Sequence, residues 1–365
     1  MAACMPGRTP GPVGIAEQQQ PCRYRAHPAR RSRPRGPGVG VPSCHYPVAP
    51  RPDRRLAAEV PCDLCIVEPT TYRQHAMIRF IFLSLLAMPV FSVPAQAGES
   101  EVVDAWCDYL GNRLRSVSAD ACHAQNFVAA EVRTPQGNPL VTRDIPAAGQ
   151  AGTEAKRILV IGGIHGDELT SISVVFRWLD WLGQADAATY QWRVIPVANP
   201  DGLMAKPSTR VNANGVDLNR NFQTPDWDRD AQDYWVKRTR RDPRRYPGKS
   251  AGSEAETRWL QDQIADYRPD LIISVHAPYN LLDYDGPVPE PMRFGRLSLN
   301  RLGVYPGSMG NYAGVFKQIP VITIELPNAT SMPSQRDQQA MWEDMLKWVR
   351  HNIKDLAVPG PTAKR

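Results

Sequence analysis

The chain has 365 residues, of which 42% are hydrophobic and 22% are charged. These values exclude a collagen, a coiled coil and a fully disordered chain, and they leave room for one large globular domain or two small ones. The formal net charge of +6 comes from residues 1–76, which hold eleven Arg and five acidic residues; residues 77–365 hold 32 basic and 32 acidic residues. Charge therefore gives no reason to expect a nucleic acid as a partner of the folded part.

Residues 1–76 are predicted to be a disordered Arg/Pro-rich extension. They carry 13 of the 35 Pro and five of the seven Cys, and they lack an apolar period. A segment of this composition buries too little apolar surface to fold. Its one Cys-x-x-Cys, at 62–65, has no second pair, so we expect neither a zinc site nor a redox site there.

A secretory signal peptide is predicted over residues 77–97. Met-Ile-Arg at 77–79 precedes an apolar run at 80–93 and then Ala-Gln-Ala at 95–97, which is the order typical of export signals. The run is shorter than the ~20 residues of a membrane span, and no Cys directly follows, so we expect no stable membrane anchor. We expect translation to start at Met77, and export, to the periplasm, to leave Gly98 as the first residue.

Only two cysteines, Cys107 and Cys122, follow the predicted cleavage site. An even pair in an exported protein is typical of a disulfide. We therefore expect one disulfide in an N-terminal segment at 98–154, ahead of the main domain.

The pattern of apolar residues predicts an α/β fold over residues 155–353, followed by a tail at 354–365. Apolar runs predict buried strands at 157–163, 192–197, 270–275 and 320–325. Helical spacing predicts helices at 168–182, 253–267 and 335–353, the second opened by a capping box at 253–256. This alternation favours a mixed, mainly parallel central sheet covered by helices on both faces. The segment at 199–251 is too long for an ordinary connection, and loops of that length are usually functional.

Polar residues stand at the ends of these strands, where ligands of such sheets gather. His165 and Glu168 follow the first strand, His276 follows the third, and Glu325 ends the fourth. Two His and one Glu with an open position for water form a typical catalytic zinc set. A lone carboxylate at the end of a buried strand, such as Glu325, needs a polar partner or a role.

Five motifs in a fixed order resemble the zinc carboxypeptidase (carboxypeptidase A-like) family. They are His165-x-x-Glu168, Gly215-Val-Asp-Leu-Asn-Arg-Asn221, Tyr246-Pro-Gly with Ser253-Glu-x-Glu, Ser274-Val-His276 and Thr323-Ile-Glu325. Within the family the chain resembles the bacterial murein peptide amidase A branch, over about residues 155–350. The fold that this resemblance implies agrees with the one predicted from the apolar pattern.

The resemblance also implies roles for individual residues. One zinc ion would be bound by His165, Glu168 and His276, with Asp217 orienting the first histidine. Glu325 would be the general base, and Arg210 would face the developing oxyanion. The substrate would be bound by Asn219 and Arg220, which clamp its carboxylate, by the mobile tyrosine, expected at Tyr305, and by Met309 near the floor of the side-chain pocket.

These roles lead us to expect an exported zinc metallocarboxypeptidase or murein peptide amidase-like hydrolase. Its substrate would be a murein peptide, cut between γ-D-glutamyl and diaminopimelate, or the C-terminal residue of a peptide. An alternative is an N-acyl amino acid deacylase similar to aspartoacylase or succinylglutamate desuccinylase; the Ser253-Glu-x-Glu motif and the position of Arg210 favour the peptidase. A second alternative is a non-catalytic cell-wall peptide receptor, which would not need Glu325.

Two further features stay open at this point. The basic run at 237–245 is typical of a solvated loop, but it could also form a rim that attracts anionic cell-wall fragments. Tyr279 and Tyr284 could either line the cleft or pack its loop.

Overall fold

The structure, a computed structural model, describes residues 96–148, 155–184 and 186–353. The predicted extension at 1–76, nearly all of the predicted signal peptide and the tail at 354–365 lie outside the described residues. The helices are α1 (Gln96–Arg113), α2 (Ala119–His123), α3 (Leu169–Leu182), α4 (Pro200–Met204), α5 (Trp227–Lys237), α6 (Ala255–Tyr267) and α7 (Gln335–Asn352). Three 3₁₀-helices, η1 (Ala187–Thr189), η2 (Leu218–Arg220) and η3 (Pro243–Arg245), and the π-helix η4 (Gly310–Phe316) complete the helical elements of the described residues.

One mixed seven-stranded sheet organises the described residues, in the order β1-β2-β4-β3-β5-β9-β6. Its strands are β1 (Val128–Arg133), β2 (Pro139–Ile145), β3 (Arg157–Ile161), β4 (Gln191–Ile195), β5 (Leu271–His276), β6 (Leu281–Asp285) and β9 (Val321–Glu325); β7 (Arg293–Phe294) and β8 (Leu297–Ser298) form a separate small hairpin. The four central strands, β4, β3, β5 and β9, are parallel. Antiparallel strands flank them on both sides, so the predicted fold class is confirmed.

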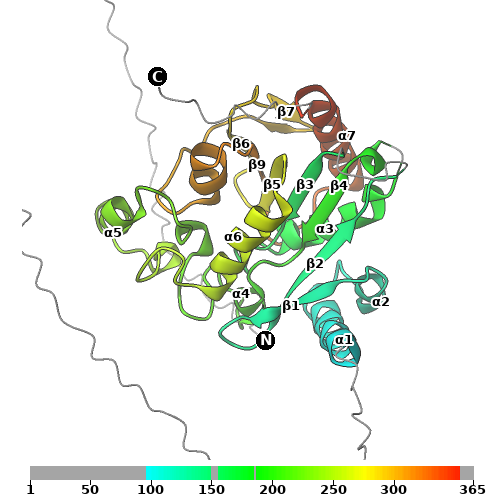
Figure 1. Cartoon of the computed structure of the whole chain (residues 1–365), viewed down its shortest axis with the longest axis horizontal. Helices are drawn as coiled ribbons and strands as arrows, with labels where there is room; N and C mark the ends of the chain where they lie inside the picture. Colours follow the sequence, from blue (N-terminus) through cyan, green and yellow to red (C-terminus); the bar gives the residue numbers. More distant parts are fainter. Residues whose placement is uncertain (1–95, 149–154, 185, 354–365) are drawn as a thin grey trace, which may run out of the picture. The chain divides into compact units, whose positions relative to one another are not determined.

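Helices cover both faces of this sheet (Figure 1). On one face α1, α3 and α7 bury a core in which the Trp342 ring lies 5.4 Å from the Trp178 ring and 6.0 Å from the Trp192 ring. On the other face α6 and η4 pack on Leu159, Ile161 and neighbouring apolar residues. Burial on both faces explains why the central strands are nearly continuous apolar runs.

Side-chain alternation assigns the polar residues of three neighbouring strands to one face. On β5, Leu271, Ile273 and Val275 belong to the core under α3 and α7, whereas Ile272 belongs to the core under α6. Because successive side chains of a strand point to opposite faces, Ser274 and His276 lie on the α6 face. The same alternation holds on β6 and β9.

The N-terminal segment contains the predicted disulfide. Cys107 in α1 and Cys122 in α2 are bonded, with 5.4 Å between their Cα atoms, so this prediction is confirmed. Both cysteines are fully buried in the core under α1 and α3. No helix in the described ranges combines the length and the apolar character that crossing a membrane would require.

Two expectations about local structure are corrected. The segment at 199–251, expected as one long connection, contains two helices, α4 and α5. The capping box at 253–256 does not form: the Ser253 hydroxyl donates to Glu254 and accepts from the Asn221 amide instead. The Glu256 carboxylate is buried and accepts a hydrogen bond from the Asn212 amide, so it does not reach back to the start of the helix.

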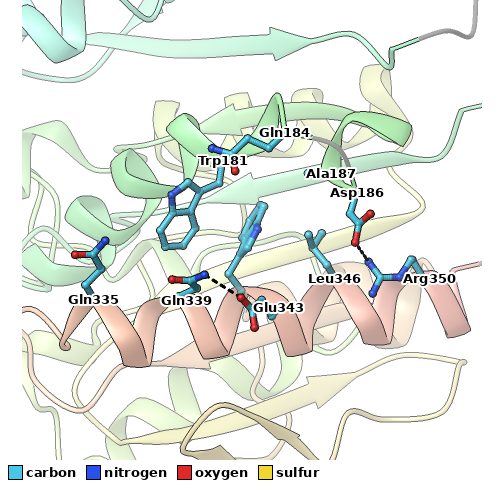
Figure 2. A pocket seen from close by; sticks show the side chains of 10 residues that line it. Trp181, Gln184, Asp186, Ala187, Gln335, Gln339, Glu343, Leu346 and Arg350 are labelled. Atoms are coloured by element: carbon cyan, nitrogen blue, oxygen red, sulfur yellow. Dashed lines mark hydrogen bonds and ion pairs between the residues drawn. The ribbon is translucent and has the colours of Figure 1, made fainter.

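A hollow between α3 and α7 is lined by Trp181, Gln335 and Gln339, with an ion pair from Asp186 to Arg350 at one end (Figure 2). Within the described part of the chain, its lining includes none of the predicted site residues. The cavity that most of those residues line lies elsewhere, on the α6 face of the sheet.

Candidate active site

The chain turns sharply after β3, and this turn positions His165 and Glu168. A Cβ on Gly166 would overlap the backbone at Gly202 and Leu203 in α4. Only glycine permits this close approach, which packs the turn that carries His165 against α4. Glu168 precedes the first turn of α3 without capping it, so its carboxylate is free to face His165.

Three donor groups converge, as the resemblance implies. The Nδ1 atom of His165 lies 2.8 Å from Glu168 Oε1, the Nδ1 atom of His276 lies 3.0 Å from Glu168 Oε2, and the two Nδ1 atoms are 3.2 Å apart. All three side chains are buried. Burial would raise the pKa of Glu168, but the two histidines outweigh it and lower that pKa.

This donor set fits a single zinc ion. Two imidazole nitrogens and a carboxylate are zinc ligands in catalytic sites, and the three donor atoms lie within 4.8 Å of one another. The Nδ1 atoms of His165 and His276 lie 3.2 Å apart beside the Glu168 carboxylate. A cation bound between them would accept a lone pair from each nitrogen and balance the negative charge of the carboxylate. In the described residues, this is the only group of three or more His, Cys, Asp or Glu that gathers in this way.

Both histidines are oriented through their second ring nitrogen. His165 Nε2 lies 3.1 Å from the Asp217 carboxylate, and His276 Nε2 lies 3.0 Å from the Ser274 hydroxyl. Such partners fix the tautomer and the ring orientation of metal-binding histidines. The role of Ser274 was not predicted, although its position two residues before His276 on a buried strand places both on one face.

Asp217 links the histidine to a buried arginine. Arg210 Nε donates to Asp217 at 2.9 Å, and Arg210 Nη1 lies 3.4 Å from Glu168. Asp217 is fully buried; burial opposes ionisation, but Arg210 and His165 hold the pKa of Asp217 well below its usual range. Arg210 lines the same cavity as the two histidines, and its charge is fixed by this carboxylate.

Glu325 lies across the strand pair from His276. The two residues are register partners on β5 and β9, and Glu325 lines the cavity while its carboxylate accepts a 3.4 Å hydrogen bond from the Tyr279 amide. Its side chain is buried, and burial raises the pKa of Glu325. A carboxylate with a raised pKa is better suited to accept and return a proton near neutral pH.

Arg220 and Asn219 enter the cavity from η2. Arg220 is only 6% exposed, yet its Nε has no hydrogen-bond partner among the described residues. The Tyr305 ring lies under this guanidinium, 4.4 Å from ring centroid to Cζ. The predicted tyrosine therefore lies at the predicted carboxylate clamp.

Met309 does not line the cavity, which corrects its expected position. Its side chain is 2% exposed and packs in the core under α6, whereas its neighbours Ser308 and Gly310 line the cavity. The Met309 amide donates to the Asn219 side chain at 2.8 Å. With its amide bound to Asn219, Met309 has its side chain in the core.

Several cavity residues were left open or were not predicted. Tyr279 lines the cavity, whereas Tyr284 packs in the core and accepts a hydrogen bond from the Val288 amide. Arg245, from the basic run, lines the cavity and lies 3.3 Å from the Tyr279 hydroxyl. Asp283 and Asp285 of β6 also line it. They were not predicted, because the alternation Asp-Tyr-Asp at 283–285 is typical of a strand with one solvated face.

The sequence matches the zinc carboxypeptidase family over residues 126–286. The murein peptide amidase A of Escherichia coli K12 is 29% identical over 227 residues, which is 59% of this chain and 88% of the relative. The murein peptide amidase A of Vibrio campbellii is 31% identical over 187 residues, 47% of this chain and 69% of the relative. A solved structure of the murein-tripeptide amidase of E. coli O157 has a TM-score of 0.40 at 25% identity, covering 60% of this chain and 89% of that one.

The chain belongs to the zinc carboxypeptidase family. It is therefore a zinc-dependent hydrolase that acts on an amide or peptide bond, and its cofactor is one zinc ion. The matched range contains both histidines and Glu168.

Proposed function

We propose that this protein is an exported zinc amidase that releases a carboxylate-bearing residue from a peptide. The favoured substrate is a murein peptide cut between γ-D-glutamyl and diaminopimelate; release of a C-terminal residue from an ordinary peptide is the same chemistry on a different acyl group. The observation that carries this proposal is the buried Nε of Arg220, which has no hydrogen-bond partner among the described residues and lies in the cavity that His165, His276 and Glu325 also line.

A buried guanidinium with a free donor needs an anionic ligand. Leaving a buried charged donor unpaired costs more than an ordinary lost hydrogen bond, whereas a carboxylate pairs with a guanidinium through two parallel bonds. Asn219, in the same cavity, offers a neighbouring amide. The leaving residue of the substrate is thus expected to carry its free carboxylate against Arg220.

The other cavity residues divide the chemistry between them. Zinc, when bound by His165, Glu168 and His276, supplies a Lewis acid that polarises the scissile carbonyl and acidifies water. Glu325 takes the proton of the attacking water and returns it to the leaving nitrogen. Arg210, held by Asp217, presents a fixed positive charge to the oxygen on which negative charge develops.

A panel of substrates separates this proposal from its alternatives. The zinc-loaded protein is incubated with the tripeptide L-Ala-γ-D-Glu-diaminopimelate, with peptides that differ in their C-terminal residue, and with N-acyl amino acids. We expect release of the terminal residue from the first or the second group. Turnover of N-acyl amino acids alone would favour the deacylase, and tight binding without turnover would favour the receptor.

An Arg220→Ala variant tests the observation on which the proposal depends. We expect kcat/KM to fall by about 10²-fold or more, since a buried charge-assisted pair is lost. Arg229→Ala is the matched control, because Arg229 is exposed on α5 and pairs with its neighbour Asp230. An Arg220→Ala variant with wild-type kcat/KM would contradict the proposed clamp.

Export through the signal peptide at 77–97 is part of the proposal. The Cys107–Cys122 disulfide supports it, because such bonds persist in oxidising compartments and are rare in reducing ones. Mass spectrometry of the secreted protein is expected to find Gly98 at the N-terminus. A secreted form that begins at Met1 would contradict this assignment.

A further inference from the structure

The hollow between α3 and α7 is a second candidate binding site. Its volume of about 340 Å³ lies in the range of small-ligand sites. None of the described residues that line it also lines the active-site cavity. Side chains of α3 and α7 face each other across it (Figure 2). A ligand in this hollow would therefore be bound separately from the zinc chemistry.

One wall of the α3–α7 hollow is an indole that rests on the core. The ring centroids of Trp181 and Trp342 lie 5.8 Å apart. Trp342 is 7% exposed and packs against the rings of Trp178 and Trp192, whereas Trp181 is only partly buried. A rigid, partly exposed indole offers apolar contact area to a ligand at a low cost in conformational entropy.

Side-chain amides supply much of the polar lining. Gln184, Gln335 and Gln339 all line the hollow and are exposed. Gln339 Nε2 donates to the Glu343 carboxylate at 3.0 Å, and Gln184 Nε2 donates to the Asp180 carbonyl at 3.0 Å. Each bond takes one of the two N–H groups of its amide, and each amide also carries an acceptor oxygen. The lining can therefore both donate to and accept from an uncharged polar ligand.

The charge of the lining does not suit an anion. Arg350 Nη1 lies 2.8 Å from Asp186 Oδ2 at one end, and Glu343 adds a second carboxylate. Two carboxylates and one guanidinium leave a net negative charge, which disfavours phosphate groups and nucleic acid. Organic cations are typically bound between several aromatic faces, but the burial of Trp342 leaves Trp181 as the open ring of the described lining. A neutral polar ligand fits this lining best.

A second polar hollow, with a volume of about 410 Å³, adjoins the first. The consecutive residues Asp180 and Trp181 of α3 line one hollow each, and so do Gln338 and Gln339 of α7. Gln338 is 6% exposed, and its Nε2 donates to the Pro333 carbonyl at 2.7 Å, but its Oε1 has no hydrogen-bond partner among the described residues. A buried acceptor without a donor is costly, and a ligand hydroxyl or amide would supply the donor. Two adjoining polar hollows suit a chain of repeating polar units.

We propose that the α3–α7 hollow binds a neutral glycan chain of N-acetylated hexose units. The pyranose ring of a hexose has an apolar C–H face, which packs on an indole, and a rim of hydroxyl groups, which exchange hydrogen bonds with amides and carboxylates. An acetamido group matches a glutamine side chain, because both carry an N–H donor and a carbonyl acceptor.

This inference does not depend on the proposed function, since the hollow shares no described lining residue with the active-site cavity. It adds a binding activity to the hydrolase. On a polymeric substrate, a second contact of this kind raises the effective concentration of the active site at the bonds that it cuts.

Calorimetry with two tetrasaccharides tests the inference. The zinc-loaded full chain is titrated with chitotetraose, which carries acetamido groups, and with cellotetraose, which carries hydroxyl groups in their place. We expect chitotetraose to bind with a Kd of about 1 mM or tighter, and about 10-fold or more tightly than cellotetraose. No binding of chitotetraose, or equal binding of the two sugars, would overturn the inference.

Variants of the lining assign this binding to the hollow. We expect Trp181→Ala, and separately the double variant Gln335→Ala/Gln339→Ala, to weaken chitotetraose binding by about 10-fold or more. Tyr109→Ala is the matched control and should bind as the wild type does, because Tyr109 is an exposed aromatic residue of α1 outside the lining of both hollows.

The double glutamine variant decides the matter if Trp181→Ala does not fold. Trp181 packs on Trp342, whereas alanine at exposed helix positions, such as 335 and 339, is favourable for the helix. Wild-type affinity for chitotetraose in either variant, once shown to be folded, would overturn the inference.

A pelleting assay identifies the source of the glycan. The wild type and the double glutamine variant are each mixed with insoluble murein and with chitin. We expect the wild type to be retained by at least one polymer, and the variant to need about 10-fold more of that polymer for equal retention. Equal retention of the two proteins on both polymers, or no retention, would overturn the inference. Neither measurement requires hydrolysis, so a failure of the proposed function and a failure of this inference are observed separately.

Discussion

Glu325 is the residue whose position most directly implies proton transfer. It is buried, it lies opposite His276 across the β5–β9 pair, and it belongs to the cavity lining without belonging to the donor group. Glu325→Gln keeps its size and its acceptor oxygen but removes its basicity. We expect kcat/KM to fall by about 10²–10⁴-fold while zinc content stays at the wild-type level, as measured by kinetics and metal analysis on the same sample.

The matched control for this variant is Glu343→Gln on the exposed side of α7. It should keep wild-type kinetics. A Glu325→Gln enzyme with a rate within a few-fold of wild type would contradict the role of Glu325 as the base.

Glu256, which does not line the cavity, is expected to make the stability of the fold depend on pH. Its side chain is fully buried and accepts from the Asn212 amide at 3.3 Å. Burial, with contributions from the neighbouring carboxylates Asp201 and Glu254, raises its pKa from the ordinary 4.5 to about 7. The folded chain therefore binds this proton more tightly than the unfolded chain, so the stabilisation is complete below pH 4.5 and is lost as the pH rises through 7.

A Glu256→Gln variant removes this titration. Between pH 4.5 and 7, the free energy of unfolding of the wild type should fall relative to that of the variant by up to about 3 kcal/mol, at about 1.4 kcal/mol per pKa unit. Urea unfolding of both proteins at several pH values measures the difference. Parallel pH profiles would show that Glu256 titrates normally.

At the scale of secondary structure, the disulfide between α1 and α2 closes a 15-residue loop. Loop-closure entropy predicts that a bridge of this span stabilises the fold by about 3 kcal/mol. The double variant Cys107→Ala/Cys122→Ala should lose about this much free energy of unfolding, as measured with urea. The same variant should respond little to a reducing agent, whereas the wild type should be destabilised by it; equal stability of oxidised and reduced wild type would contradict this.

The elements that could be predicted from the sequence are those that are buried on both sides. The expected strands correspond to β3, β4, β5 and β9, and the helices to α3, α6 and α7, because continuous apolar runs and 3.6-residue spacing mark them. The hairpin β1–β2 was missed since its strands are only partly buried. Helix α5 was missed because only Trp227 and Ala231 of its eleven residues are buried.

The part of the candidate site that could be predicted from the sequence is the part that lies next to buried strands. Donors that directly follow buried strands, such as His165 and His276, must meet at one edge of a parallel sheet. Asp283 and Asp285 were not predictable, because alternating carboxylates in a short strand are typical of a solvated surface. Only the pairing of β6 with β9 reveals that this alternation faces the cavity. Met309 was misplaced because the sequence alone does not fix which way a side chain of the 305–312 segment points.

At the scale of the whole molecule, the fold gathers one buried set of zinc donors: His165 and Glu168 from the turn between β3 and α3, and His276 at the end of β5. These three donors are separated by up to 111 positions in the chain and come together only in the folded protein. Zinc-dependent hydrolysis needs all three donors in place. The family membership of the chain agrees with it.

Zinc content tests this centre most directly. The purified full chain is loaded with zinc and dialysed to remove excess metal. Its zinc content per chain is then measured by elemental mass spectrometry. We expect one zinc ion per chain in the wild type and essentially none in a folded His165→Ala/His276→Ala variant. A wild-type protein that is folded but retains no zinc, or a double variant that retains one ion per chain, would contradict the account.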